Sequence, residues 1–310
     1  YSNVDTGQLQ VLRPYRIDGS SLPAVQNFAT PAGTGPILEL VMHPQGFDYY
    51  YITGPVPGGA TVYRLFQLDP ATGVSSPVLS STSALKHMVF GRMGDFYTCD
   101  GSVLKRFSCD GSVFQLLGSR TLSLIPEALA YEDASDAIAT LTPSAATASH
   151  VLTRYSRNMD TNLGSATLPG LPTISGEVAM DFRRSDGHLF MCASGNPMIF
   201  QFNNLGSMSF PGITLPAGSS PRGLNMADSG NAMFVNNGVL NEFMEVAGAG
   251  WMVDPSSLFH GTPAGNRFFL ARSRTNHDSA HEGPEFNNIL TPEIAPNGIE
   301  HELRRLHYDI

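Results

Sequence analysis

The sequence has few charged residues and no long apolar run. Charged residues make up 15% of the 310 residues, and hydrophobic residues make up 42%. No unbroken apolar stretch approaches the roughly 20 residues that a membrane-spanning helix needs. A chain of this length and composition can bury a sizeable core, so we expect a folded protein without membrane insertion.

Lysine is almost absent. Lys86 and Lys105 are the two lysines of the chain, and the formal net charge is −9. A protein that binds phosphate backbones carries clustered positive charge, and no tract rich in lysine or arginine occurs here. We therefore expect no nucleic-acid partner.

Cysteine is also scarce. The three cysteines, Cys99, Cys109 and Cys192, lack the CxxC spacing that zinc and redox sites use. A hairpin turn near Gly101 would place Cys99 opposite a residue near Leu104 and leave Cys109 out of reach. We therefore expect thiols rather than a disulfide.

An initiator methionine and an N-terminal leader are missing as well. The chain begins at Tyr1, and whether Tyr1 is the mature terminus stays open. Such a start favours a processed and exported protein, so we expect an extracellular, cell-surface or virion location.

Glycine, proline and internal repetition are what the sequence does contain. The 31 glycines and 22 prolines indicate many turns and short elements. A first repeat has a valine, then an aromatic residue four positions later, then Asp or Asn three positions after that. Each copy is typical of a strand that ends in a turn. The copies span residues 11–18, 62–69, 103–110 and 151–158, with a shortened relative at 199–203.

A second repeat is eleven residues long and ends in Asp or Asn. Its copies align without a gap and span residues 38–48, 85–95, 126–136, 176–186 and 221–231. A short apolar strand follows each copy, so the unit is strand, turn, strand, loop, strand, turn, strand. Repetition at this length predicts an all-β array of four-stranded units.

This unit resembles the four-stranded blade of a β-propeller, especially in the group with NHL, YVTN and gluconolactonase-like blades. The resemblance covers about residues 8–274. Counting the copies predicts six blades, with seven as the alternative. The incomplete repeats at the two ends of the chain also predict how the ring closes. N-terminal outer strands are expected to pair with C-terminal inner strands in one blade.

The two ends of the chain complete this expected organisation. Residues 256–266 fit an eleven-residue copy that would begin the closing blade, whereas an alternative register begins that copy at Asn266. Residues 1–274 form the expected propeller domain. Residues 275–310 depart from the repeat and form an expected C-terminal arm with a short terminal helix at 299–306.

One position of the eleven-residue repeat is polar in every copy. The innermost strands of a propeller line its central channel, so equivalent positions form a ring there. The second position of each copy supplies the candidates for a channel ligand site, which are Glu39, Lys86, Glu127, Glu177 and Arg222.

The resemblance to gluconolactonase-like propellers implies one divalent metal in this channel, calcium or a similar ion. Its candidate ligands are Glu39, Glu177, Asp181 and Asn225. The alternative is that carboxylates and cations of the ring neutralise one another and no cofactor is bound.

Two local patterns have structural interpretations. Side chains alternate between the faces of a strand, so at least one of Tyr49, Tyr50 and Tyr51 is expected to pack between blades. Three Asp-Gly pairs are expected to be hairpin turns rather than calcium loops. These pairs are Asp100-Gly101, Asp110-Gly111 and Asp186-Gly187.

No nucleophile elbow, HExxH motif or P-loop occurs, and no catalytic residue is assigned. We therefore expect a non-enzymatic recognition or scaffold module in a larger assembly, with protein partners bound in part through residues 275–310. One alternative is a metal-dependent, lactonase-like hydrolase or lyase that works in the channel. A glycan-binding propeller is the other.

Overall fold

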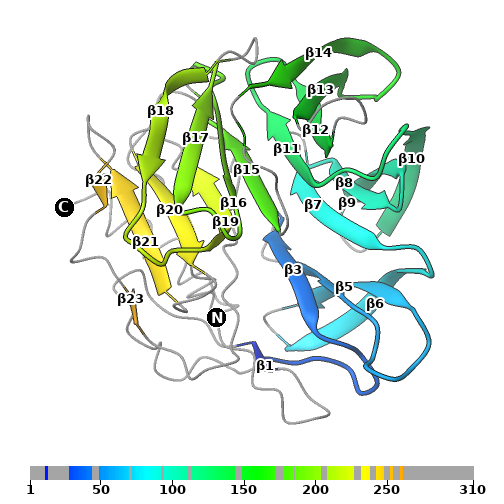
Figure 1. The fold of residues 1–310 in the computed structure, drawn as a ribbon. Coiled ribbons are helices and arrows are strands. Elements are labelled where there is room, and N and C mark those ends of the chain that lie inside the picture. Colours follow the sequence, from blue (N-terminus) through cyan, green and yellow to red (C-terminus); the bar gives the residue numbers. More distant parts are fainter. Residues whose placement is uncertain are drawn as a thin grey trace, which may run out of the picture.

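The computed structural model is built of β-strands throughout the part of the chain that it describes (Figure 1). It describes residues 11–12, 28–43, 49–69, 72–91, 94–110, 113–143, 149–169, 171, 177–184, 186–203, 208–226, 232–237, 242–247, 252–253 and 259–260. Within these residues, no helix is long and apolar enough to cross a membrane.

Each of the first four eleven-residue copies opens one antiparallel, four-stranded sheet. The first sheet consists of β3 (Ile37–Met42), β4 (Tyr49–Thr53), β5 (Tyr63–Asp69) and β6 (Val74–Ser81). The second consists of β7 (Leu85–Phe90), β8 (Phe96–Asp100), β9 (Val103–Asp110) and β10 (Val113–Thr121). The third consists of β11 (Ala128–Glu132), β12 (Ala137–Pro143), β13 (His150–Ser156) and β14 (Asn162–Leu168). The fourth consists of β15 (Val178–Phe182), β16 (Leu189–Ala193), β17 (Met198–Phe202) and β18 (Met208–Thr214). The predicted four-stranded unit is therefore confirmed.

A fifth sheet begins in the same way but ends differently. Its strands are β19 (Pro221–Met226), β20 (Ala232–Asn237), β21 (Glu242–Ala247), β22 (Met252–Val253) and β23 (Phe259–His260). Both β22 and β23 pair with β21, so together they form the outer edge of this sheet. The prediction that residues 256–266 begin an inner strand is therefore wrong at Phe259 and His260. A short apolar stretch suits an outer strand as well as an inner one, and the sequence pattern could not separate the two.

The N-terminal pair of strands forms a separate sheet. Here β1 (Val11–Leu12) pairs with β2 (Phe28–Ala29). The predicted closure by C-terminal inner strands, the register beginning at Asn266 and the arm at 275–310 lie outside the described residues. The described chain is thus an all-β propeller arrangement of four complete blades and a fifth sheet, and a total of six or seven blades stays a prediction.

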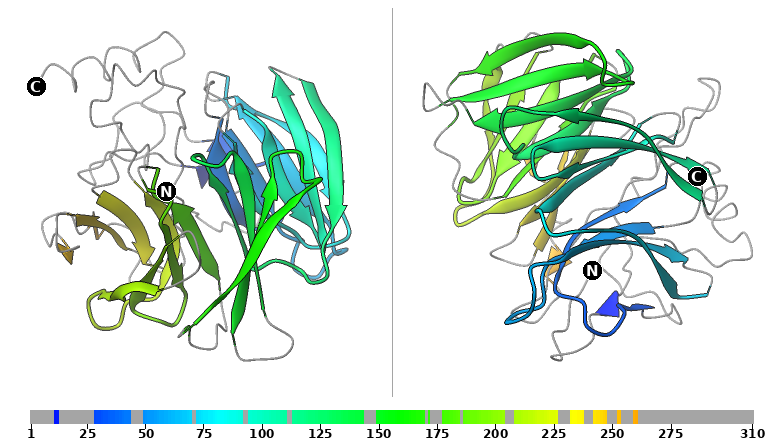
Figure 2. Two further views of the ribbon diagram at one scale, coloured as in Figure 1. Left: turned by 90° about the horizontal axis from the view of Figure 1, so that it is seen from above. Right: turned by 90° about the vertical axis from the view of Figure 1, so that its right-hand side faces the viewer.

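The first strand of each sheet is its innermost strand. Along the chain β3 lies beside β7, β7 beside β11, β11 beside β15, and β15 beside β19. Figure 1 shows these strands grouped at the centre, and Figure 2 shows from two further sides how the sheets stand around them. The predicted inner position of the eleven-residue copies is therefore confirmed.

Apolar side chains fill the space between neighbouring sheets. Tyr49, Tyr50 and Tyr51 are all buried, and Tyr50 packs against Phe90 and Phe96 of the second sheet at ring-centroid distances of 5.4 and 5.8 Å. The prediction that a tyrosine of this trio packs between blades is confirmed. Similar clusters join the second sheet to the third, the third to the fourth and the fourth to the fifth.

The hairpin between β8 and β9 has the predicted form. Asp100 pairs with Val103 across a two-residue turn in which Gly101 has a φ of 61°, a conformation that favours glycine. Cys99 lies opposite Leu104, as expected. None of the three cysteines forms a disulfide and all are buried, and burial raises the pKa of the Cys192 thiol to about 12.

The outer strands have irregular edges. The pairing of the third with the fourth strand shifts register once or twice in each of the four complete sheets. In β10 the shift falls between Leu116 and Gly118, which makes Leu117 an extra residue. Such bulges hinder the addition of a further strand to an exposed edge.

Candidate functional site

The predicted ring residues lie at one end of the first strands. We call this end, where the first strands begin, the start rim, and the opposite end, where they turn into the second strands, the turn rim. Glu39, Lys86 and Arg222 lie in the first three residues of β3, β7 and β19, and Glu127 and Glu177 directly precede β11 and β15. The backbone of all five therefore lies at the start rim, although the side chains of Arg222 and Asn225 lie outside the described residues.

Glu39 connects the first sheet to the second. Its Oε1 accepts a hydrogen bond from the backbone N–H of Met88 at 2.9 Å. Lys86 pairs with Cys99 and Met88 with Thr98, so His87 is the extra residue of a bulge in β7. The Glu39 carboxylate thus satisfies a backbone donor beside this bulge.

His87 is a start-rim residue that the sequence patterns missed. It is half-buried and has a φ of 57°, a left-handed conformation that costs a non-glycine residue about 1–3 kcal/mol. Burial and the neighbouring charge of Lys86 lower the pKa of His87 to about 4, against a hydrogen bond with the backbone of Pro126. His87 is therefore neutral at pH 7 and connects the second sheet to the segment that leads into the third.

Glu127 contacts a second histidine that the sequence patterns missed. His150 Nε2 lies 3.0 Å from Glu127 Oε2, and the side chains are 6% and 27% exposed, respectively. The repeat offered one weak signal, because His150 directly precedes the valine that opens the copy at residues 151–158. This contact holds the Glu127 carboxylate against the third sheet.

Asp181 connects the fourth sheet to the fifth. It is buried, and its Oδ2 accepts a hydrogen bond from the backbone N–H of Met226 at 2.9 Å. Its Oδ1 accepts another from the N–H of Phe182, also at 2.9 Å. Asp181 and Glu39 therefore each accept a backbone N–H from the next sheet, between different pairs of sheets.

The metal-site hypothesis gains no support from this geometry. Within the described residues, no group of three or more His, Cys, Asp or Glu side chains is placed to hold a metal ion. Glu39 and Asp181 hold backbone amides, and Glu177 is an exposed residue. Because Asn225 is among the candidate ligands, the metal stays a prediction and we derive no chemistry through it.

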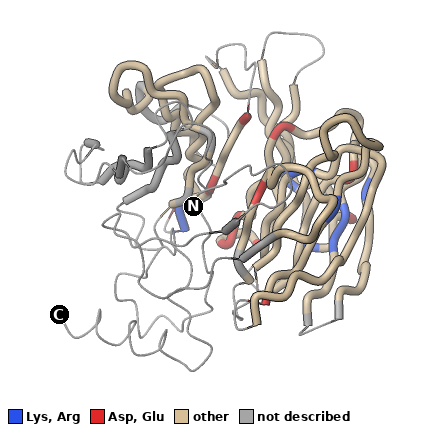
Figure 3. The backbone as a smooth tube through the Cα atoms, turned by 90° about the horizontal axis from the view of Figure 1, so that it is seen from below, with Lys and Arg blue, Asp and Glu red and all other residues tan. Residues whose placement is uncertain are grey.

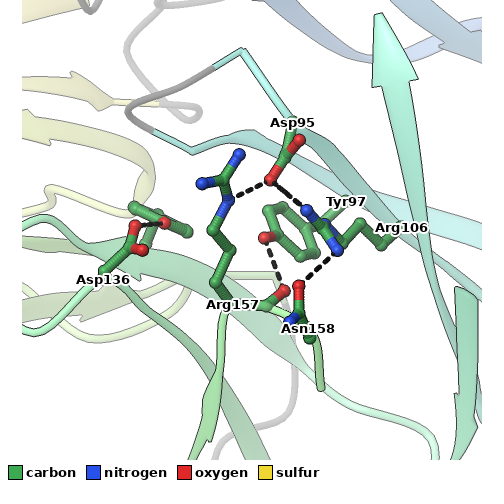
Figure 4. A network of polar contacts seen from close by, with 7 residues as sticks. Asp95, Tyr97, Arg106, Asp136, Arg157 and Asn158 are labelled. Atoms are coloured by element: carbon green, nitrogen blue, oxygen red, sulfur yellow. Dashed lines mark hydrogen bonds and ion pairs between the residues drawn. The ribbon is translucent and has the colours of Figure 1, made fainter. Parts of the chain in front are cut away.

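A larger polar network lies at the turn rim, between the second and third sheets (Figure 4). Asp95 is buried, and its Oδ2 accepts hydrogen bonds from Arg106 Nη2 at 2.8 Å and from Arg157 Nε. Arg106 also donates to Asn158 Oδ1, and the Tyr97 hydroxyl donates to the backbone carbonyl of Arg157. The Asp95 contact raises the pKa of Arg157 further above its ordinary value. These contacts join one sheet to the next, as expected of a structural network.

Figure 3 marks the acidic and basic residues along the backbone of the described chain. Three cations of the second and third sheets are compensated, because Lys105 pairs with Asp100, Arg106 with Asp95 and Arg154 with Glu132. At the start rim, by contrast, one cation lacks such a pair within the described chain. Lys86 is exposed, and no carboxylate of the described residues pairs with it.

Exposed aliphatic side chains gather in one short segment. In the described part of the chain six large hydrophobic side chains are exposed, and four of them fall within residues 116–125. Their exposed fractions are 52% for Leu116, 45% for Leu117, 36% for Leu124 and 51% for Ile125. The other two are Val74 at 57% and Leu163 at 44%, on different outer strands. We call residues 116–125 the aliphatic segment; it runs from β10 into the connector that reaches the start rim.

Comparison with known proteins supports the fold. No protein-family model matches the chain, and no curated protein matches it. A chain in a crystal structure of a nidogen/laminin complex is similar, with a TM-score of 0.57 and 10% identity over 82% of this chain and 93% of that one.

Two further structures resemble the chain less closely. The propeller domain of Cps50 (Swd1) from Myceliophteria thermophila has a TM-score of 0.49 and 11% identity, over 69% of this chain and 65% of that one. A candidate 6-phosphogluconolactonase from Bacteroides uniformis has a TM-score of 0.44 and 18% identity, over 70% and 68%. Scores this low carry no argument. The sheets and the first likeness together identify the chain as a β-propeller, at the level of fold.

Proposed function

We propose that this protein is a non-enzymatic recognition module, or scaffold, that binds protein partners within a larger assembly. The observation that carries this proposal is the aliphatic segment. Apolar side chains that cluster on a surface lose unfavourable hydration when a partner covers them, whereas scattered ones are ordinary. Four such side chains within the ten residues of β10 and the connector that follows it favour a binding surface.

The polar side chains of the inner strands support the same interpretation. Glu39 and Asp181 hold backbone amides of the next sheet, and Glu127 contacts a buried histidine. A carboxylate with such a structural partner holds its sheet in place. A rigid ring of this kind presents loops and outer strands at fixed positions, which suits recognition.

Two finer features belong to the proposal. We place the protein in an extracellular, cell-surface or virion assembly, and we assign residues 275–310 a share in partner binding. Truncation after Arg274 tests whether residues 275–310 bind partners. Loss of the complex, while the propeller stays folded, would support this role. We also propose six blades, counted from the repeat.

Native mass spectrometry of the protein isolated from its source tests the proposed function. We expect the full-length chain in a complex, and we expect L116S/L117S or L124S/I125S to release it as a monomer. The matched control is V74S/L163S, which removes exposed aliphatic side chains elsewhere and should leave the complex intact. A monomer for the unaltered chain, or equal release by all three variants, would contradict the proposal.

A further inference from the structure

We propose that Lys86, Leu124 and Ile125 form one docking site at the start rim, and that its occupant is a partner segment that presents a carboxylate beside an aliphatic side chain. This inference rests on the proposed function and narrows it to a place and a partner chemistry. It follows from three features: the positions of these residues, the rigidity of the connector and the charge of Lys86.

Strand β7 lies beside β11, and His87 forms a hydrogen bond with the backbone of Pro126, two residues before β11. These contacts bring the parts of the site together. Lys86 directly precedes His87, and Ile125 directly precedes Pro126. Lys86 and Ile125 are therefore each one residue away from this hydrogen bond, and Leu124 is two residues away. Lys86 belongs to β7 and the aliphatic pair to the connector between β10 and β11, which explains why the sequence patterns did not join them.

The connector that carries Leu124 and Ile125 is fixed at both ends. The N–H of Leu122 donates to the carbonyl of Ser102 at 2.8 Å, and the N–H of Glu127 donates to the carbonyl of Leu141 at 2.8 Å. Leu122 and Pro126 are buried, whereas Leu124 and Ile125 between them are exposed. The two aliphatic side chains are thus presented on a short, anchored backbone, so little conformational entropy is lost when a partner binds.

The charge of Lys86 selects the partner. The neighbouring carboxylates are engaged, since Glu39 accepts the N–H of Met88 and Glu127 contacts His150. Lys86 is exposed, and no carboxylate of the described chain pairs with it. Its charge already acts locally, because it helps to lower the pKa of His87. A partner carboxylate complements this charge, and complementary charges determine which partner binds.

Strand addition is a less suitable mode of binding here. The outer strand next to the site, β10, has a bulge at Leu117, and the third-to-fourth strand pairing is irregular in every complete sheet. Such edges resist a further strand. We therefore assign recognition to the side chains of Lys86, Leu124 and Ile125 rather than to a backbone edge.

A displayed library of random peptides, selected on the full-length protein, tests the proposal. We expect the selected peptides to contain Asp or Glu close to Leu, Ile or Val. Synthetic copies should lose about tenfold in affinity for K86E and for I125S. The affinity for V74S and L163S, the matched exposed controls, should not change.

A charge exchange makes the test specific. Replacing the acidic residue of a selected peptide by Lys should weaken binding to the unaltered protein and restore it to K86E. Peptides that bind K86E and I125S as well as the unaltered protein, yet lose affinity for L116S/L117S, would overturn this site while the proposed function stands. If no substitution in the aliphatic segment or at Lys86 changes the affinity of the peptides, both the docking site and the proposed function are overturned.

Discussion

Asp181 of the fourth sheet holds the backbone N–H of Met226 in the fifth sheet at 2.9 Å. Glu39 and Met88 repeat this relationship between the first and second sheets. Side chains that the sequence offered as metal ligands therefore join inner strands that share no strand-to-strand ladder. The propeller is stabilised at these points by polar contacts as well as by apolar packing.

Removing the Asp181 carboxylate should destabilise the protein. In D181A the amides of Phe182 and Met226 lose their acceptor in a buried place, which costs about 1–3 kcal/mol for each unsatisfied group. The midpoint of urea unfolding should fall accordingly. E177A removes an exposed carboxylate beside the first residue of β15 and should lower the midpoint less than D181A does. Equal midpoints for D181A and the unaltered protein would contradict this role.

The Asp95 carboxylate should contribute more to the stability of the fold than other acidic residues at the turn rim do. D95A leaves Arg106 and Arg157 without their shared carboxylate, and breaking a buried ion pair of this kind costs about 3–5 kcal/mol. Thermal unfolding should begin at a clearly lower temperature. D160A removes a fully exposed carboxylate that accepts hydrogen bonds from Ser156 and Thr161 in the hairpin that carries Arg157, and it should shift the transition much less. A small effect of D95A would show that the network contributes little.

His87 should make the protein less stable in mild acid. Its folded pKa is about 4 and its ordinary value is 6.5, so below pH 6.5 the unfolded chain binds a proton that the folded chain does not. The stability contributed by neutral His87 is complete above pH 6.5 and declines as the pH falls toward 4, by up to about 3 kcal/mol.

The variant H87N isolates this effect. Asparagine tolerates the left-handed conformation of residue 87 and does not titrate. Urea unfolding measured at pH 7 and at pH 5 should therefore show a smaller decline for H87N than for the unaltered protein. The same decline in both proteins would assign the acid sensitivity to other groups.

The cysteines should be unreactive in the folded protein. Cys99, Cys109 and Cys192 are buried, and burial raises the pKa of Cys99 and Cys192 above the ordinary value. The thiolate is the reactive form, so iodoacetamide at pH 8 should label no thiol before unfolding and all three after it. Rapid labelling of one cysteine in the folded state would contradict the burial of that residue.

The fold was largely predictable because its repeat has a direct physical cause. Each inner strand needs an apolar run and a turn residue, so the eleven-residue copies at 85–95 and 126–136 recur in a recognisable form. The opposition of Cys99 and Leu104 followed from the turn at Gly101 alone. The outer strand at Phe259–His260 was mistaken for an inner one, because an apolar pair suits both positions.

The site was predictable only in part. Equivalent positions in the repeat put the backbone of Glu39 and Glu127 at the same rim, but the repeat does not show what the side chains contact. Glu39 meets the amide of Met88 because of the bulge at His87, and a bulge leaves no pattern in the sequence. The contact of His87 with Pro126 joins the second sheet to the connector that leads into the third, so no pattern within one unit could have indicated it.

Photo-crosslinking from the aliphatic segment tests the central claim most directly. Because the native cysteines are buried, S123C supplies one exposed thiol for a benzophenone label between Leu122 and Leu124, and S76C supplies a control on β6. In material from the source of the protein, we predict that S123C forms a crosslink to one defined protein, that S76C does not, and that K86E reduces the yield. No crosslink from S123C, or the same crosslinks from both positions, would contradict the claim that this propeller recognises a partner through residues 116–125.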